Sequence, residues 1–378
     1  MRSMRTPKHT FMGKINKKIY FFVGTTTELI KLSPIISELE KRKINFKIIA
    51  SGQTKIKFDE LSLIIKKRKA DISLGDKIDR SSVIKFSLWS ISAFLKAFSL
   101  RKEFKGLNSK NSYFIVHGDP VSSLIGAVVA KFYRLKLVHI ESGLRSFNFL
   151  EPFPEEICRV LISGMADIHF CPNEWAMKNL SHGKGEKVNT FQNTLIESYW
   201  RVASKKKLYD KELELGSKKY FVLIVHRQEH VIFGKEKSEQ LIKFILDNSP
   251  KNMTCVFVTH AITSNFLESV KFKLGIHKNR VRLVSRLRYP EFVSLLDNAQ
   301  FVLTDGGSNQ EELYYMGVPC VLLRNDTERI EGLGENVVLS KGKKTIIKSF
   351  MKNYKKYRRD KIKIKKRPSK IIVDKLEN

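Results

Sequence analysis

The chain has 378 residues, of which 42% are hydrophobic and 10% aromatic, and its 70 Lys and Arg against 38 Asp and Glu give a formal net charge of +32. This size and apolar content exclude a disulfide-stapled miniprotein and a globally disordered chain, and they suggest two domains. The four cysteines lie far apart without a CxxC pair, so the sequence favours neither a zinc ribbon nor a redox motif and fits a reducing, cytoplasmic compartment.

In the first half of the chain, strand-like runs alternate with helix-length segments, the pattern of a parallel sheet covered by helices on both faces. Strands are predicted at residues 18–23, 46–50, 113–116, 136–140 and 167–171, and helices at residues 29–42, 121–133 and 173–180. The most apolar segment, residues 86–100, is broken by serines and a lysine. It predicts a buried or amphipathic helix, because a membrane span needs about 18 uninterrupted apolar residues.

The same rhythm restarts after a lysine-rich stretch, residues 204–219, which we interpret as the linker region. Strands are predicted at residues 220–225, 254–259, 281–284, 301–304 and 320–323. We therefore divide the chain into an N-terminal domain, residues 18–197, and a C-terminal, nucleotide-binding domain, residues 198–345.

The two ends of the chain carry much of the positive charge. Residues 1–17 form a basic tail without the apolar core of a secretory signal, and residues 341–378 contain 16 basic and three acidic groups. There is no zinc-finger spacing or RNA-binding aromatic pattern, so we expect no nucleic-acid partner. We interpret residues 346–378 as a basic C-terminal helix or tail that packs back on the N-terminal domain. Its charge run is either a solvated face or a weak contact with an anionic membrane.

A polar or glycine residue follows nearly every predicted strand. Ligands of open α/β sheets bind beyond the carboxyl ends of the strands. The residues in that position include Gly24, Asp119, Glu141, His226, His260 and Asp305. The sequence therefore predicts an α/β fold of two Rossmann-like domains, whose parallel sheets face each other across a nucleotide-sized interdomain cleft.

Three carboxylates, Asp119, Glu141 and Glu155, are expected in that cleft together with His226 from the second domain. Such neighbours shift one another's pKa values apart, and acid/base chemistry on a sugar needs groups that take and give protons at carbon. A helix N-cap is the alternative for Asp119, and the helix dipole alone would favour a carboxylate at Glu155. No HxH, HExxH or DxD spacing supports a metal site, so we expect none.

Residues 305–308, Asp-Gly-Gly-Ser, form a glycine-rich connection from strand to helix, whose free amides would cradle a phosphate. One turn into the helix, Glu312 can accept hydrogen bonds from ribose hydroxyls, and further along Arg329 can reach a diphosphate. The turn that begins at Gly24, GTTTE, is neither GxGxxG nor a Walker loop. It therefore indicates neither a dinucleotide nor ATP, and its threonines serve equally well as helix caps.

Taken together, these motifs resemble the UDP-N-acetylglucosamine 2-epimerase family. They occur in family order from about residue 20 to residue 340, which makes chance similarity improbable. In chain order they are GTTTELIK at 24–31, HGD at 117–119, HIESGLRSFN at 139–148, PFPEE at 152–156 with Arg159, NTLI at 193–196, HRQE at 226–229, TDGG at 304–307 with QEE at 310–312, GVP at 317–319, and Arg324 with TER at 327–329.

The resemblance implies a glycosyltransferase-B-like architecture and an isomerase that inverts C2 of a UDP-2-acetamido sugar for surface polysaccharide and nucleotide-sugar biosynthesis. The reaction eliminates UDP to leave a 2-acetamidoglucal and then adds UDP back, whereas hydrolysing relatives add water and release the free sugar. A homodimer without metal or NAD is implied as well. Carried over by motif, the acid/base set is Asp119, Glu141, Glu155 and His226, and the substrate contacts are Lys31, Arg145, Arg159, Gly24, Gln53, Phe292 at the uracil, Gly306, Gly307, Ser308, Glu312 at the ribose and Arg329 at the diphosphate.

The chain departs from the family pattern at four places, one of which is Gln192 in place of the usual glycine before Asn193. Thr26 replaces the arginine of the usual GTRPE turn, the usual DSGG is DGGS at 305–308, and only Gln53 remains of a Gln-His pair that helps to bind an activating second UDP-sugar. We therefore expect weakened or absent allosteric activation, with a diacetamido sugar or a uronate as alternative substrates to UDP-GlcNAc. Two other interpretations stay open: a glycosyltransferase of the same architecture, and a nucleotide-sugar binder without turnover.

Overall fold

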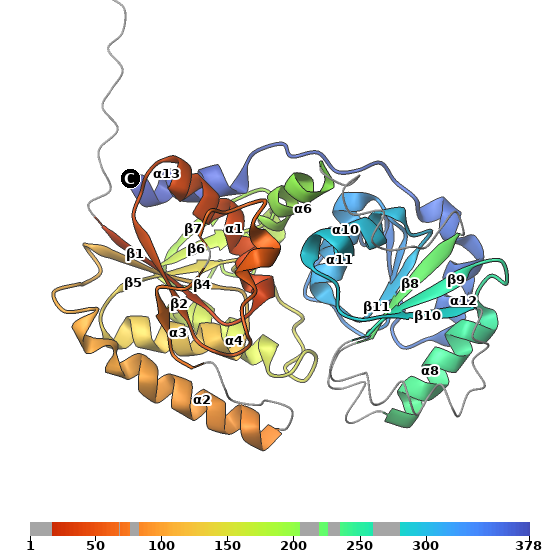
Figure 1. Cartoon of the computed structure of the whole chain (residues 1–378), viewed down its shortest axis with the longest axis horizontal. Coiled ribbons are helices and arrows are strands. Elements are labelled where there is room, and N and C mark those ends of the chain that lie inside the picture. The colour runs from red at the N-terminus through yellow and green to blue at the C-terminus, as the bar shows by residue number, and fades with distance from the viewer. Residues whose placement is uncertain (1–16, 68, 76–82, 205–218, 226–234, 260–279) are drawn as a thin grey trace, which may run out of the picture.

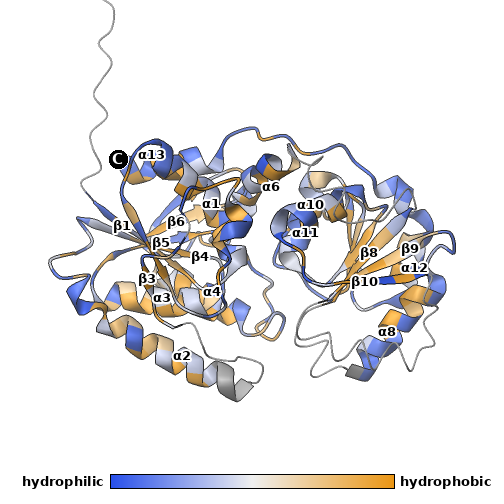
Figure 2. Cartoon of the chain, in the orientation of Figure 1, coloured by the Kyte–Doolittle hydropathy of each residue, from blue (hydrophilic) through white to orange (hydrophobic). Residues whose placement is uncertain are grey.

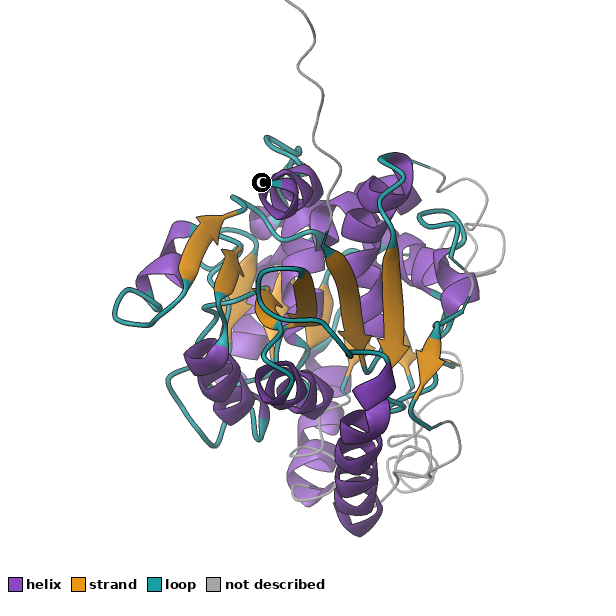
Figure 3. Cartoon of the chain, turned by 90° about the vertical axis from the view of Figure 1, so that its left-hand side faces the viewer, coloured by secondary structure: helices purple, strands orange, loops and turns teal. Residues whose placement is uncertain are grey.

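The computed structural model describes residues 17–67, 69–75, 83–204, 219–225, 235–259 and 280–378. Two α/β domains lie side by side (Figure 1), each built on one parallel sheet. Helices cover both faces of the N-terminal sheet, as the turned view of Figure 3 shows. The predicted fold class is therefore confirmed, although most of the predicted linker falls outside the described residues.

The N-terminal sheet has seven strands in the order β3-β2-β1-β4-β5-β6-β7. Its central strands are buried on both faces, which explains their continuous apolar sequences. The strands are β1 (Lys18–Val23), β2 (Phe46–Ala50), β3 (Ile72–Ser73), β4 (Ser112–His117), β5 (Lys136–Ile140), β6 (Ile168–Cys171) and β7 (Glu186–Asn189). The helices are α1 (Thr26–Lys41), α2 (Val83–Phe98), α3 (Val121–Phe132), α4 (Glu155–Met165), α5 (Glu174–Lys178) and α6 (Leu195–Ala203), with single turns η1 (Phe58–Leu61) and η2 (Ser99–Lys102).

The C-terminal sheet has six strands in the order β10-β9-β8-β11-β12-β13. These are β8 (Tyr220–Ile224), β9 (Thr254–Val258), β10 (Val281–Val284), β11 (Val302–Thr304), β12 (Cys320–Leu322) and β13 (Val337–Leu339). The described helices that follow the N-terminal domain are α8 (Lys235–Asn248), α10 (Tyr289–Asn298), α11 (Gly307–Met316), α12 (Lys344–Asn353), the turn η5 (Tyr354–Tyr357) and α13 (Pro368–Glu377).

All ten strands predicted from the sequence are present, each within one residue of the predicted bounds. The sequence analysis missed β3, β7 and β13. Each of these three lies at an edge of its sheet, where a strand is short or polar and lacks a long apolar run. The missed strands therefore widen the two sheets without changing the predicted domain layout.

The end of the chain returns from the C-terminal domain to the N-terminal domain. Residues 358–367 lead from η5 to α13, which packs against α1 (Figure 1). Val373 and Leu376 of α13 are fully buried in the same apolar cluster as α1. Arg42, just after α1, forms an ion pair with Asp374 at 2.7 Å. This last helix therefore ties the C-terminal domain to the N-terminal one.

Apolar residues are concentrated in the two sheets, with polar residues on the outer helices (Figure 2). Helix α2 is an exception, because the side chains of Leu88, Ile91 and Leu95 are 59–64% exposed. Phe132, at the end of α3, is 62% exposed. Among the described residues, none of the helices combines the length and the hydropathy that crossing a membrane requires.

Candidate active site

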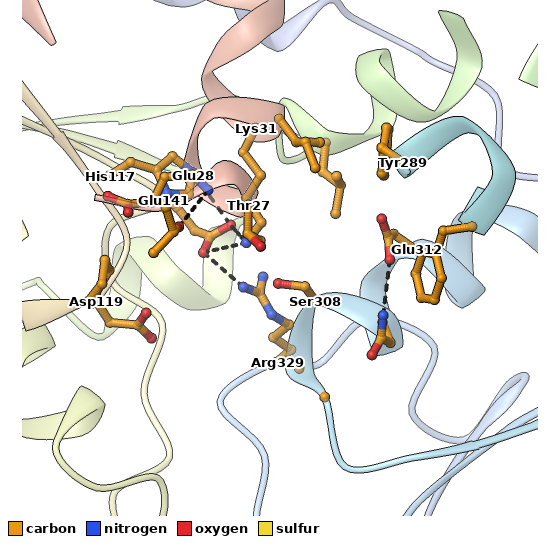
Figure 4. A pocket seen from close by; sticks show the side chains of 18 of the residues that line it. Thr27, Glu28, Lys31, His117, Asp119, Glu141, Tyr289, Ser308, Glu312 and Arg329 are labelled. Atoms are coloured by element: carbon orange, nitrogen blue, oxygen red, sulfur yellow. Dashed lines mark hydrogen bonds and ion pairs between the residues drawn. The ribbon is translucent and has the colours of Figure 1, made fainter. Parts of the chain in front are cut away.

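A cavity of about 340 Å³ lies between the two domains, beyond the carboxyl ends of their strands. Its N-terminal wall contains the start of α1, the residues after β4 and β5, and the start of α4. Its C-terminal wall contains the starts of α10 and α11 and the segment around residue 328 (Figure 4). The predicted site residues that line it are Lys31, Asp119, Glu141, Glu155, Arg159, Phe292, Gly306, Gly307, Ser308, Glu312 and Arg329.

Glu141 is at the centre of the charged groups in this cavity. It follows β5 with a positive φ of 62°, a conformation that costs a non-glycine residue of order 1 kcal/mol and recurs at functional sites. Lys31 Nζ lies 2.7 and 2.9 Å from its two carboxylate oxygens, and an Arg329 guanidinium nitrogen lies 2.8 Å from Oε1 (Figure 4). Burial alone raises the pKa of Glu141, but the charges of Arg329 and Lys31 outweigh it and hold that pKa well below its usual range.

His117, the last residue of β4, lies beside Glu141. Its Nε2 atom is buried, lies 3.9 Å from Glu141 Oε2, and makes no hydrogen bond with any described residue. Burial lowers the pKa of His117 to about 3, against the attraction of Glu141. The imidazole is therefore neutral, with one unpaired polar atom in the wall of the cavity.

A second group of charges orients Asp119. The Arg159 guanidinium of α4 forms an ion pair with Asp119 and another with Glu156, the latter at 2.8 Å. Arg159 also lies 3.7 Å from Glu328 of the other domain. Glu155, the first residue of α4, lines the same cavity. Asp119, Glu141 and Glu155 thus all line the cavity from the N-terminal domain, and Asp119 is paired with a different cation from Glu141.

The C-terminal wall is built around the first turn of α11. Gly306 and Gly307 begin this helix, and a Cβ at Gly307 would come within 2.1 Å of Glu328 Oε1, so a larger residue there would have to displace the Glu328 side chain. Farther along α11, Glu312 accepts a hydrogen bond from Asn309 Nδ2 at 3.3 Å. Burial nevertheless raises the pKa of Glu312 to about 7. Backbone donors and a titratable carboxyl thus lie one helical turn apart.

Three of the predicted substrate contacts, Arg145, Gln53 and Gly24, are not among the residues that line the cavity. Arg145 Nε donates to the buried Glu156 at 2.5 Å, so this arginine holds the start of α4. Gln53 accepts from the Ser122 backbone N–H at 3.0 Å. Gly24 is needed for close packing, because a Cβ there would lie 2.1 Å from Ser122 Oγ. The prediction for His226 falls outside the residues that the structure describes.

Several residues that line the cavity were missed as site residues. Glu28 is buried in the first turn of α1, where it accepts hydrogen bonds from Gly24 N at 3.0 Å and Ser123 Oγ at 3.2 Å. Burial raises the pKa of Glu28 to about 7. Its place inside the GTTTE motif was the available signal, whereas nothing in the sequence singles out Arg286 or Tyr289. Within the described ranges, no group of three or more His, Cys, Asp or Glu residues is placed to hold a metal ion.

A model of the family described as UDP-N-acetylglucosamine 2-epimerase matches residues 38–370 of the sequence. The chain belongs to this family. It is 29% identical over 354 residues to the UDP-N-acetylglucosamine 2-epimerase of Campylobacter jejuni, which covers 89% of each chain. It is 31% identical over 350 residues to that of Methanocaldococcus jannaschii, which covers 88% of this chain and 91% of the relative. The predicted resemblance is thus confirmed, and the relatives are named as 2-epimerases, a class of isomerase.

Solved structures of family members share the fold. The Neisseria meningitidis UDP-GlcNAc 2-epimerase bound to UDP-GlcNAc has a TM-score of 0.79 and 27% identity, over 95% of this chain and 99% of that one. The Methanocaldococcus jannaschii enzyme in complex with UDP-GlcNAc and UDP has a TM-score of 0.80 and 26% identity, with the same coverage. The two-domain, glycosyltransferase-B-like architecture expected for this epimerase family is therefore present here.

Proposed function

We propose that this protein is a UDP-N-acetylglucosamine 2-epimerase that inverts C2 of a UDP-2-acetamido sugar in the cytoplasm. The observation that carries the proposal is one cavity with several carboxylates on one wall, among them Asp119, Glu141 and Glu155, and a glycine-rich helix start on the other. A glycosyltransferase needs a single base and an acceptor groove. Several carboxylates around one sugar-sized space suit proton transfer at carbon better.

The C-terminal wall is suited to the UDP portion of the substrate. Gly306 N–H donates to Thr304 Oγ1 at 3.0 Å, so the backbone N–H groups of Gly307 and Ser308, together with the Arg329 guanidinium, would hold the diphosphate. Helix starts and arginines both favour phosphate oxygens. Ionised Glu312 would accept hydrogen bonds from the ribose hydroxyls. Phe292 on α10 would stack on the uracil.

With UDP held there, C1 and C2 of the sugar would face the N-terminal wall. A carboxylate takes the proton from C2, the electron pair forms the C1–C2 double bond, and the C1–O bond breaks so that UDP leaves with its electrons. Addition of UDP to the 2-acetamidoglucal, with a proton delivered to the opposite face of C2, gives the inverted product. Asp119, Glu155 and His226 are the remaining proposed acid/base groups. Neither a metal nor NAD enters this route.

The test is a proton NMR time course with UDP-GlcNAc in deuterated water. Deuterium at C2 of a UDP-linked manno product is the expected result. Release of free N-acetylmannosamine and UDP would instead identify a hydrolysing epimerase. Release of UDP with transfer of the sugar, and without deuterium at C2, would overturn the proposal in favour of a glycosyltransferase. UDP binding without any reaction would favour a binder.

We also propose that the protein forms a homodimer through the exposed apolar face of α2 and α3. Phe98 links the two helices there, since its ring centroid lies 4.5 Å from those of both Phe94 and Phe132. An apolar patch of this kind on a folded protein marks an interface. Leu95→Glu should yield monomers in sedimentation velocity, while Lys96→Ala should not.

Weak contact between residues 346–378 and anionic membranes is a separate proposal, which co-sedimentation with anionic and neutral vesicles tests.

A further inference from the structure

The carboxylate of Glu141 is unusually well satisfied for a group that must take up a proton. Its Oε1 faces Lys31 Nζ at 2.9 Å and Arg329 at 2.8 Å, and its Oε2 faces Lys31 Nζ at 2.7 Å and the Asn193 amide. Two adjacent cations favour the ionised form. In this arrangement the Glu141 carboxylate is therefore a poor base for any proton, including the one at C2.

One of these cations is also a proposed ligand of the substrate. Arg329 comes from the C-terminal domain, where its other terminal nitrogen lies 2.7 Å from Glu311 Oε2. It thus bridges a carboxylate of each domain beside the helix start that would hold the diphosphate. A diphosphate carries more negative charge than a carboxylate, and its oxygens can accept hydrogen bonds from both terminal nitrogens of a guanidinium. Nucleotide binding therefore competes directly with Glu141 for Arg329.

His117 provides what a protonated Glu141 would need. Its buried Nε2 has no hydrogen-bond partner among the described residues and lies 3.9 Å from Glu141 Oε2, the oxygen that Arg329 does not contact. A neutral imidazole has one ring nitrogen that accepts a hydrogen bond. A buried polar atom without a partner is costly, and with the ring proton on Nδ1 the partner that Nε2 needs is a hydrogen-bond donor.

We propose that Glu141 becomes the base at C2 only when a bound diphosphate has drawn Arg329 away, and that His117 then accepts the hydrogen bond of the protonated Glu141 carboxyl. This inference rests on the proposed function. The C2–H bond breaks, its proton goes to Glu141 Oε2, and the C1–O electron pair leaves with UDP. Asp119 is paired instead with Arg159 of its own domain.

The groups that face Glu141 define the pH dependence. They are Lys31 on α1, His117 on β4, Asn193 before α6, and, from the other domain, Glu311 on α11 and Arg329. A hydrogen bond from protonated Glu141 to His117 stabilises the protonated form in the substrate complex. The loss of activity at acid pH reports protonation of Glu141 in the substrate complex. It should therefore move to lower pH when residue 117 no longer accepts this hydrogen bond.

The experiment compares His117→Leu, which removes the acceptor, with His117→Gln, which keeps one at similar reach. The readouts are the rate of deuterium incorporation at C2 at saturating UDP-GlcNAc between pH 5 and 9, and the Kd for UDP. We expect His117→Leu to slow exchange about tenfold, with the acid limb of its profile lower by about one pH unit and the Kd for UDP within twofold. His117→Gln should recover most of the rate. A slower variant whose acid limb stays in place would overturn the inference.

A second measurement tests the role of Arg329 without turnover. Calorimetry of UDP binding in two buffers of different ionisation enthalpy gives the number of protons taken up. Wild type should take up more protons than Glu141→Gln near pH 6.5, and uridine, which lacks phosphate, should abolish that difference. Equal uptake by the two proteins would overturn the inference even if His117→Leu failed to bind UDP. Absence of C2 exchange in the wild type would overturn the proposed function and this inference with it.

Discussion

The contribution of Glu312 to UDP affinity, through hydrogen bonds to the ribose, should increase as the pH rises. Burial raises the pKa of Glu312 to about 7. About one tenth of this carboxyl is then ionised at pH 6 and nearly all of it at pH 8.5. Only the ionised form has acceptor oxygens free for both ribose hydroxyls. If that form alone binds, the Glu312 contribution to UDP affinity grows roughly tenfold across this range.

The assay is the Kd for UDP by titration calorimetry, for wild type and for Glu312→Gln, at several pH values. UDP itself titrates in this range, and so does Glu28. Both effects are common to the two proteins and cancel in the ratio of the two Kd values. We expect the ratio of the Glu312→Gln Kd to the wild-type Kd to rise about tenfold from pH 6 to pH 8.5. A ratio that stays constant within twofold would refute the reasoning.

Three further predictions concern stability and kinetics. Because burial raises the pKa of Glu28 to about 7, the folded protein keeps a proton that the unfolded chain releases, so the free energy of unfolding falls as the pH rises to 7. In urea unfolding, Glu28→Gln should therefore gain up to about 3 kcal/mol relative to wild type between pH 4.5 and 7.5. A stability difference between the two proteins that does not change with pH would contradict this. Leu376→Ala should lower the free energy of unfolding by about 2–5 kcal/mol, whereas the exposed Lys370→Ala control should change it by less than about 0.5 kcal/mol; equal effects would mean that α13 is not anchored by its apolar face. Initial rates should depend hyperbolically on UDP-GlcNAc, since the amide oxygen of Gln53 is occupied by Ser122 N; a sigmoidal curve would show that an activating site survives.

Much of the fold could be predicted because a buried parallel strand is a continuous apolar run, whatever surrounds it. The residue after such a run lies at the edge of the sheet, so Asp119 and Glu141 could be placed in the cleft from their positions alone. Edge strands escaped the same reasoning, since β3 has two residues and β7 reads Glu-Lys-Val-Asn. The pairing of Arg145 with Glu156 could not be predicted, because a motif does not say whether a cation faces the cavity or a buried carboxylate.

The sequence by itself therefore determined the two-sheet architecture, the position of the cleft and most of the charged side chains that line it. Only the tertiary structure decided which cation meets which carboxylate. Arg329 pairs with Glu141 from 188 residues away and in another domain, a choice among 70 basic side chains that local patterns cannot make. Burial was likewise decided by packing, and burial is what keeps His117 neutral and raises the pKa of Glu28 and Glu312, because desolvation penalises the charged form of each group.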